Sequence, residues 1–290
     1  MKKILLLMLA VILCLTLCSC DTILKKAKTM VTGEEEPTMP EDYIATLEND
    51  EYSYELYDDY VKIIKYLVKD GESTVTIPSE IDGVPVTVIG SLCFHDIKTN
   101  VTTVNIPDSV TTIEESAFYY ADKLTTIVIP DTVTSIGSRA FAWCNALETI
   151  TFGNNITEIP DYCFNHCASI KTVVIPETIK RIGVRAFSYC ENLAEITVTK
   201  EIEGVGDRAF SGCKELEFVT FENSNISIGS NVFENSPKVV IIAPDDTNAK
   251  KYCEDNNLRW STSKDIEAVV LGGDESSDST NENDSNTANA

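Results

Sequence analysis

Residues 124–146 read LTTIVIPDTVTSIGSRAFAWCNA, and the same 23-residue pattern recurs along the chain. Five blocks follow one another without a gap, beginning at Val101, Leu124, Leu147, Ile170 and Leu193. A sixth block begins at Leu216, and Val239 opens a truncated seventh. Self-similarity at a fixed period of roughly 20 to 50 residues indicates stacked structural units. The repeat therefore decides the fold.

An irregular block precedes the regular ones, from about Glu72 to Asn100. It carries the same TIP, VIG and CF landmarks, but the stretch SEIDGVPVTVIG is lengthened around Gly83 and Pro85. We interpret this block as the first repeat with an added turn.

The apolar positions within one block first alternate and then change to helical spacing. Leu124, Ile127 and Ile129 lie on the alternating part, whereas Ala140 and Phe141 lie on the later part. Each repeat is therefore predicted to contain one short parallel β-strand, a turn and a helical or irregular return segment.

Stacked repeats need neighbours to complete their burial and protected ends to remain soluble. We expect repeats over residues 72–238, an N-terminal β cap over 49–71 and a C-terminal cap over 239–260. The first cap reads as two strands around a turn at Asp58 and Asp59. The second contains a predicted helix that starts between Asp245 and Asn248.

The first twenty residues, MKKILLLMLAVILCLTLCSC, combine two lysines with an apolar stretch and read as an export signal over residues 1–19. The stretch LCSC resembles a bacterial lipobox, which implies cleavage after Ser19 and acylation of Cys20. A plain signal peptide and an N-terminal anchor helix are the alternatives. Residues 20–48 then read as an acylated tether, and the polar, acidic residues 261–290 as a disordered tail.

The chain carries 46 acidic and 23 basic residues, for a formal net charge of -23. Phosphate backbones and anionic lipid headgroups would be repelled by such a charge, which argues against nucleic-acid binding. We expect contact with a membrane only through the lipid anchor.

The consensus LxxIxIPxxVxxIGxxAFxxC resembles the BspA-type leucine-rich repeat of bacterial surface proteins, over about residues 72–238. The resemblance implies a leucine-rich-repeat solenoid, capped at both ends, on an extracytoplasmic, membrane-anchored protein of the cell surface. Members of that family are often implicated in adhesion to host matrix proteins or to other bacteria. The departures are local and stand at repeat positions otherwise filled by glycine or cysteine: Glu114, Pro160, Ala121 and Ser236.

The outward positions of the strands are predicted to form two regular rows. The first row consists of Thr103, Thr126, Thr149, Thr172, Glu195 and Phe218. The second consists of Asn105, Val128, Thr151, Val174, Thr197 and Thr220. We expect a ligand to contact this strand-lined concave face; an ice-binding threonine array is an alternative, although threonine is also simply a good exposed strand residue.

A second candidate surface is the column Tyr120, Trp143, His166 and Tyr189 on the return segments. Aromatic rings in a row could contact sugar rings or anchor a protein partner. The alternative is that the rings lean over neighbouring repeats and shield the core.

The cysteines Cys144, Cys167, Cys190 and Cys213 recur every 23 residues, and we expect buried free thiols that act as small hydrophobes. Disulfides remain open, because export compartments permit them. The cluster Cys163, His166 and Cys167 resembles a metal motif, but its two cysteines are predicted to face inward and its histidine outward, so we expect no metal site.

These features predict a lipid-anchored, adhesin-like binding module that recognises a protein or a glycan. A structural or assembly component of the cell envelope is the alternative. We find no catalytic constellation in the sequence and expect neither an enzyme nor a cofactor.

Overall fold

The computed structural model describes residues 40, 42–67, 71–95, 100–263 and 270–271. The predicted signal peptide and lipidation site Cys20 lie outside these residues. The chain divides into two compact units, residues 1–43 and 44–290, and the description that follows concerns the second. Within the described residues, no helix is both long enough and apolar enough to cross a membrane.

Three strands precede the repeats: β1 (Tyr43–Glu48), β2 (Tyr52–Tyr57) and β3 (Val61–Tyr66). They are hydrogen-bonded in that order, and β2 pairs antiparallel with β3. The expectation of a tether through residue 48 was wrong at its end, because residues 43–48 form β1. The tyrosine, isoleucine and threonine of this segment favour an extended, paired backbone.

The irregular first turn contains β4 (Thr74–Thr76), β5 (Glu80–Ile81) and β6 (Val84–Ile89). Its added turn is a hairpin in which β5 pairs antiparallel with β6. Asp82 and Gly83 connect the two strands with left-handed backbones, at φ 51° and 78°.

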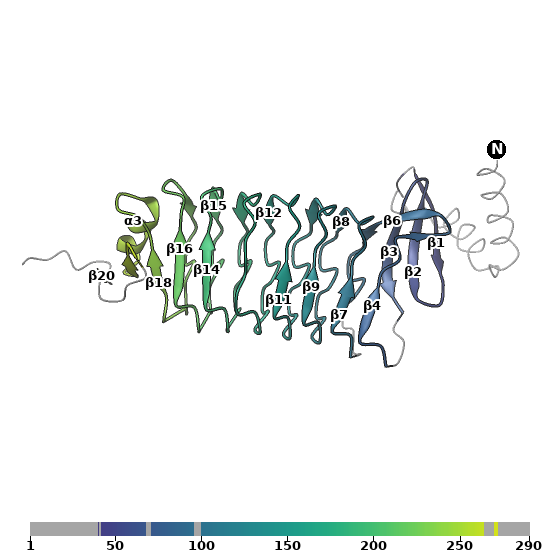
Figure 1. Ribbon diagram of the computed structural model, residues 1–290, viewed down its shortest axis with the longest axis horizontal. Helices are drawn as coiled ribbons and strands as arrows, with labels where there is room; N and C mark the ends of the chain where they lie inside the picture. Colours follow the sequence, from purple (N-terminus) through teal and green to yellow (C-terminus); the bar gives the residue numbers. More distant parts are fainter. Residues whose placement is uncertain (1–39, 41, 68–70, 96–99, 264–269, 272–290) are drawn as a thin grey trace, which may run out of the picture. The chain divides into compact units, whose positions relative to one another are not determined.

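The regular turns stack side by side as a solenoid (Figure 1), which confirms the predicted fold. The first parallel ladder contains β7 (Thr103–Asn105), β9 (Thr126–Val128), β11 (Thr149–Thr151), β14 (Glu195–Val198), β16 (Phe218–Phe221) and β18 (Val240–Ile242). Its pairing is interrupted between β11 and β14, where Thr172 forms only an isolated bridge with Glu195. A second ladder contains β8 (Thr112–Ile113), β10 (Ser135–Ile136), β12 (Glu158–Ile159), β13 (Arg181–Ile182), β15 (Gly204–Val205) and β17 (Ser227–Ile228). Most turns therefore have two short strands. The second strand lies in the part of the repeat that was predicted to be a helical or irregular return segment.

The second ladder is interrupted between β10 and β12, where Pro160 replaces the glycine of the repeat. In neighbouring turns this glycine donates its N–H to the turn before, as Gly183 does to the Ile159 carbonyl oxygen at 2.8 Å. Proline has no N–H to donate. The departure at Pro160 thus removes one hydrogen bond between turns.

A column of phenylalanines fills the interior, with one ring from each turn. Consecutive rings stack nearly parallel, with centroids 4.8 to 5.9 Å apart. The column consists of Phe94, Phe118, Phe141, Phe164, Phe187, Phe210 and Phe233. Tyr66 of β3 stacks on its first ring, and Tyr252 of the C-terminal cap contacts its last ring edge-on.

The return segments are joined by three backbone hydrogen bonds per turn. The N–H groups of Arg139, Phe141 and Trp143 donate to carbonyl oxygens in the next turn at 2.8 to 3.1 Å. The first and third of these donors have left-handed backbones, with φ of 57° and 65°. The same arrangement recurs in every turn from Ser116 to Gly212.

The C-terminal cap contains α3 (Asn248–Asp255), β19 (Arg259–Ser261) and β20 (Val270–Leu271). The Thr247 side chain accepts a hydrogen bond from the Lys250 N–H and so caps α3 at the predicted position. β19 pairs parallel with β18, and β20 pairs antiparallel with β19. Residues 261 and 270–271, which were predicted to belong to a disordered tail, are therefore strand residues.

The glycine of the repeat is required where successive turns approach most closely. A Cβ atom on Gly183 would lie 2.5 Å from the Asp161 backbone nitrogen, whereas one on Gly204 would have no neighbour nearer than 3.8 Å. We predict that Gly183→Ala lowers the free energy of unfolding by about 2 kcal/mol or more through overpacking. Urea denaturation measures the change.

Gly204→Ala is the matched control, since it adds the same methyl group in the same turn region without a clash. It is expected to be neutral or to stabilise by about 0.5 kcal/mol, because alanine lowers the entropy of the unfolded chain. Equal effects of the two substitutions would contradict the close approach of the turns at Gly183.

Candidate functional site

The two outward rows of the first ladder form one surface, which we call the strand face. It consists of Thr103, Thr126, Thr149, Thr172, Glu195 and Phe218 in one row, and Asn105, Val128, Thr151, Val174, Thr197 and Thr220 in the other. Neighbouring strands align the rows in register, as for Thr103 with Thr126 and Thr126 with Thr149. The structure therefore brings together the residues that the repeat period placed on one face.

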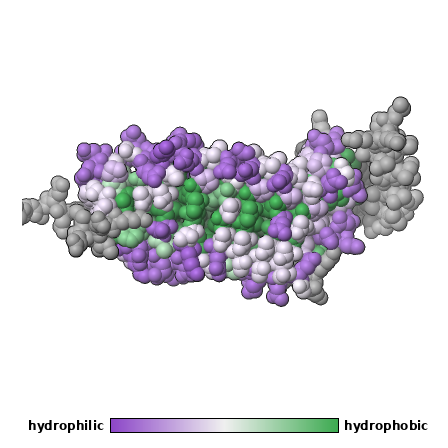
Figure 2. Space-filling view, viewed as in Figure 1, coloured by the Kyte–Doolittle hydropathy of each residue, from purple (hydrophilic) through white to green (hydrophobic). Residues whose placement is uncertain are grey.

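The strand face is depleted in charge. Glu195 is the single ionisable residue among its twelve positions, in a chain of which 24% is charged. Val174 is 82% exposed and Val128 is 53% exposed. Figure 2, drawn in the orientation of Figure 1, shows an apolar band along the middle of the molecule, but its colours do not mark the threonines of the strand face as apolar.

A shallow cavity of about 350 Å³ opens on the strand face at its first two regular turns. Thr103, Asn105, Thr126 and Val128 line it, with Asp108 at its margin. Hydroxyl and amide groups provide hydrogen bonds there, and Val128 provides an apolar contact. This mixture is typical of a binding surface and contains no nucleophile paired with a base.

The aromatic residues of the return segments form a continuous stack, which we call the aromatic column. Ring centroids lie 5.2 Å apart for Tyr120 and Trp143, 3.8 Å for Trp143 and His166, and 4.4 Å for His166 and Tyr189. The planes of these pairs differ by only 6° to 8°. Both faces of Trp143 and His166 are thereby covered, so these two rings have no face left for a sugar ring.

The aromatic column ends on Gly212, which occupies the next equivalent position with φ 77°. A Cβ atom there would lie 2.8 Å from the Tyr189 ring, so the glycine makes room for that ring. Burial among its neighbours lowers the pKa of His166, against a smaller opposite effect of Glu191. His166 is therefore a neutral side chain near pH 7.

Sequence reasoning missed a second column beside the aromatic one, which we call the arginine column. It consists of Ser116, Arg139, Tyr162, Arg185, Arg208 and Asn231, and all six have left-handed backbones. The guanidinium carbons of Arg139 and Arg185 lie 4.8 and 5.6 Å from the centre of the Tyr162 ring. The signal was present in the sequence, since its three arginines occupy one repeat position.

The repeated cysteines are buried free thiols that act as hydrogen-bond donors. Each donates to the carbonyl oxygen of the phenylalanine 26 residues earlier, at 3.1 to 3.3 Å. Ser236, which replaces cysteine in the sixth block, makes the equivalent bond to Phe210 at 2.9 Å. All seven described cysteines are free and buried.

The residues of the possible metal motif do not converge. Cys163 and Cys167 are fully buried, whereas His166 is stacked in the aromatic column. In the part of the chain that the structure describes, no three histidine, cysteine or acidic side chains are placed to hold a metal ion.

Stacked 23-residue turns with this internal column define a leucine-rich-repeat solenoid. A family model described as BspA type Leucine rich repeat region matches residues 73–124 and 111–240, in six copies. The chain belongs to this family, which confirms the resemblance drawn from the repeat pattern.

Solved structures similar to the chain include two leucine-rich repeat proteins. The T. pallidum Leucine Rich Repeat protein (TpLRR) is 29% identical with a TM-score of 0.62, and the match covers 72% of this chain and 95% of that one. A leucine-rich repeat protein from Eubacterium ventriosum is 27% identical with a TM-score of 0.57. That match covers 67% of this chain but only 50% of the other. A search of curated proteins found no match.

The buried thiols give the fold a dependence on alkaline pH. Burial raises the pKa of the Cys213 thiol from 9.0 to about 12. The unfolded chain therefore loses this proton first, so stability is fully present below pH 9 and is lost as the pH rises toward 12. We predict that the free energy of unfolding in urea is smaller at about pH 10.5 than at about pH 8.

Cys213→Ser is the control for this effect. Serine can make the same hydrogen bond to the Phe187 carbonyl oxygen, as Ser236 does in its own turn, and it does not titrate. Its alkaline loss of stability should be smaller than that of the wild type. An unchanged pH dependence would mean that other groups cause the loss.

Proposed function

We propose that this protein is a binding module of the bacterial cell surface, which recognises a protein or glycan through the strand face and is held to the membrane by a lipid on Cys20. Its family is typically a non-enzymatic binding scaffold. The proposal assigns it no catalytic step.

The charge depletion of the strand face carries the proposal. A chain with net charge -23 has abundant acidic residues for an exposed surface, yet eleven of these twelve positions are neutral. Charged residues are likewise depleted at the centres of protein interfaces. Exposed Val128 and Val174 would lose contact with water when a partner covers them, which favours association.

The lipid anchor is supported by sequence alone. Leu17, Ser19 and Cys20 occupy the positions of a lipobox, after the apolar stretch of an export signal. We predict that cells fed an alkyne fatty acid label the full chain and that Cys20→Ser abolishes the label. Cys18→Ser is the control and should retain it. Label that persists in Cys20→Ser would contradict acylation at Cys20.

Strand-face recognition is tested with a panel of immobilised matrix proteins and a glycan array. We predict that the double variant with Thr149→Lys and Thr172→Lys binds at least tenfold more weakly than the wild type to any matrix protein or glycan that the wild type binds. Two lysines in the centre of the strand face would place charge and bulk inside the interface.

Ser135→Lys is the matched control, because Ser135 is an exposed hydroxyl residue on the second ladder. It should bind as the wild type does, and circular dichroism should show that all variants are folded. Retention unaffected by the two strand-face lysines would contradict this site.

A further inference from the structure

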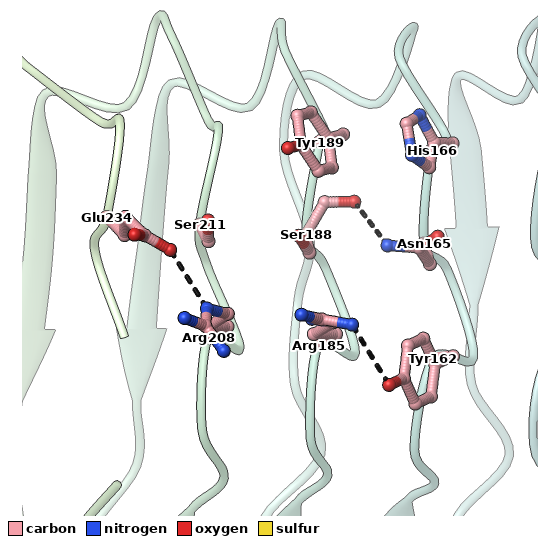
Figure 3. Close-up of a pocket in the computed structure, with 9 residues that line it drawn as sticks. All are labelled: Tyr162, Asn165, His166, Arg185, Ser188, Tyr189, Arg208, Ser211 and Glu234. Carbon is pink, nitrogen blue, oxygen red and sulfur yellow. Dashed lines mark hydrogen bonds and ion pairs between the residues drawn. The ribbon is translucent and has the colours of Figure 1, made fainter. Parts of the chain in front are cut away.

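A second cavity lies between the aromatic column and the arginine column, apart from the strand face. It measures about 230 Å³, far more than the roughly 15 Å³ that one water molecule needs. Figure 3 shows it crossing successive turns, with Tyr162 and Arg185 on one side and His166 and Tyr189 on the other. Asn165 and two serines lie between these two sides.

The cavity has a net positive lining in a strongly acidic chain. Of its charged residues, Arg208 pairs with Glu234, with Nε and Oε2 2.9 Å apart. Arg185 has no carboxylate partner among the described residues; its Nη1 donates to the Tyr162 hydroxyl at 3.1 Å. A guanidinium carries five N–H donors, so Arg185 retains donors for an anionic ligand.

A buried hydroxyl in the same cavity has no partner. Ser188 is 1% exposed, and its Oγ forms no hydrogen bond within the described structure. Buried polar groups are normally hydrogen-bonded, and an unpaired one costs free energy. Ser188 lines the cavity, and a ligand oxygen reached by rotation of this hydroxyl about the Cα–Cβ bond would provide the missing partner.

The aromatic rings favour an anion as well. His166 and Tyr189 stack face to face, and the far side of Tyr189 rests against Gly212. The rings therefore present their edges to the cavity. Ring edges carry the positive part of the aromatic quadrupole, which attracts negative charge.

The backbone around the cavity does not suit a peptide. The N–H groups of His166, Tyr189 and Gly212 already donate to the next turn. A bound peptide would find these donors occupied and would bury its own amide groups without partners. Sugar hydroxyls both donate and accept hydrogen bonds, so they match the side-chain hydroxyls of the cavity. They also match the Asn165 amide, which uses one donor on the Ser188 carbonyl oxygen and keeps its second N–H and its Oδ1.

We propose that this cavity binds an acidic sugar. Its carboxylate or sulfate accepts hydrogen bonds from Arg185, and its hydroxyls pair with Ser188, Ser211 and the Asn165 side chain. The site is formed by the return segments, whereas the strand face is formed by the first ladder. The proposal therefore does not depend on the function proposed above.

The test compares cellobiouronic acid with cellobiose by calorimetric titration of the full chain, since these disaccharides differ in one carboxylate. The acid should bind at least tenfold more tightly. Arg185→Gln should weaken binding of the acid about tenfold or more, because it removes a charge-assisted hydrogen bond. Ser188→Ala should weaken it severalfold without lowering Tm, since this hydroxyl has no partner to lose.

Arg181→Gln is the matched control for charge, because Arg181 is exposed in β13 and pairs with Glu158 and Asp161. It should bind the acid as the wild type does. The strand-face variant with Thr149→Lys and Thr172→Lys should do so too. Failure of one site is therefore distinguishable from failure of the other.

Five results would overturn the proposal. Equal affinity for cellobiose and for the acid would exclude recognition of the charge. Equal affinity for inorganic sulfate would reduce the site to a general oxyanion site, and equal affinity for tetraglutamate would indicate an acidic peptide. Full binding of the acid by Arg185→Gln, or no binding by the wild type, would remove the site altogether.

Discussion

The close approach of successive return segments is the constraint on which the rest of the structure depends. Three N–H groups per turn reach the next turn only because the first and third donors have left-handed backbones. That conformation costs an L-residue roughly 1 to 2 kcal/mol. The hydrogen bonds and the stacked phenylalanine column offset this cost in each turn.

The same constraint determines which surfaces the protein can use. The two left-handed positions direct side chains outward, and their repetition produces the aromatic and arginine columns. Because the turns lie so close there, Trp143 and His166 are covered on both faces and leave only their edges exposed. The strand face differs, since its short side chains stand out from the ladder and remain accessible.

The period predicted the columns well, because a residue and its equivalent 23 positions later must lie on adjacent turns. It predicted the buried cysteines and the threonine rows, whereas the helix of the C-terminal cap was predicted from its start signal between Asp245 and Asn248. The second ladder was missed because strands of two residues, such as Ser135–Ile136, show no alternation. The arginine column was missed because Arg139 and Arg185 read as ordinary solvated charges, and neither arginine nor tryptophan indicates a left-handed backbone. Because the sequence does not reveal that conformation, it could not predict that Arg185, Ser188 and the aromatic rings line one cavity.

The two candidate surfaces differ in local charge from the chain as a whole. Repulsion by an acidic surface is screened beyond about 8 Å at physiological ionic strength, so it acts mainly between surfaces already close to contact. A partner that approaches the strand face meets an almost uncharged surface and escapes that repulsion. An anionic ligand meets a favourable charge at the cavity, where no carboxylate of the described residues pairs with Arg185. Both candidate surfaces thus differ in charge from the strongly acidic chain as a whole, which supports the two proposed sites.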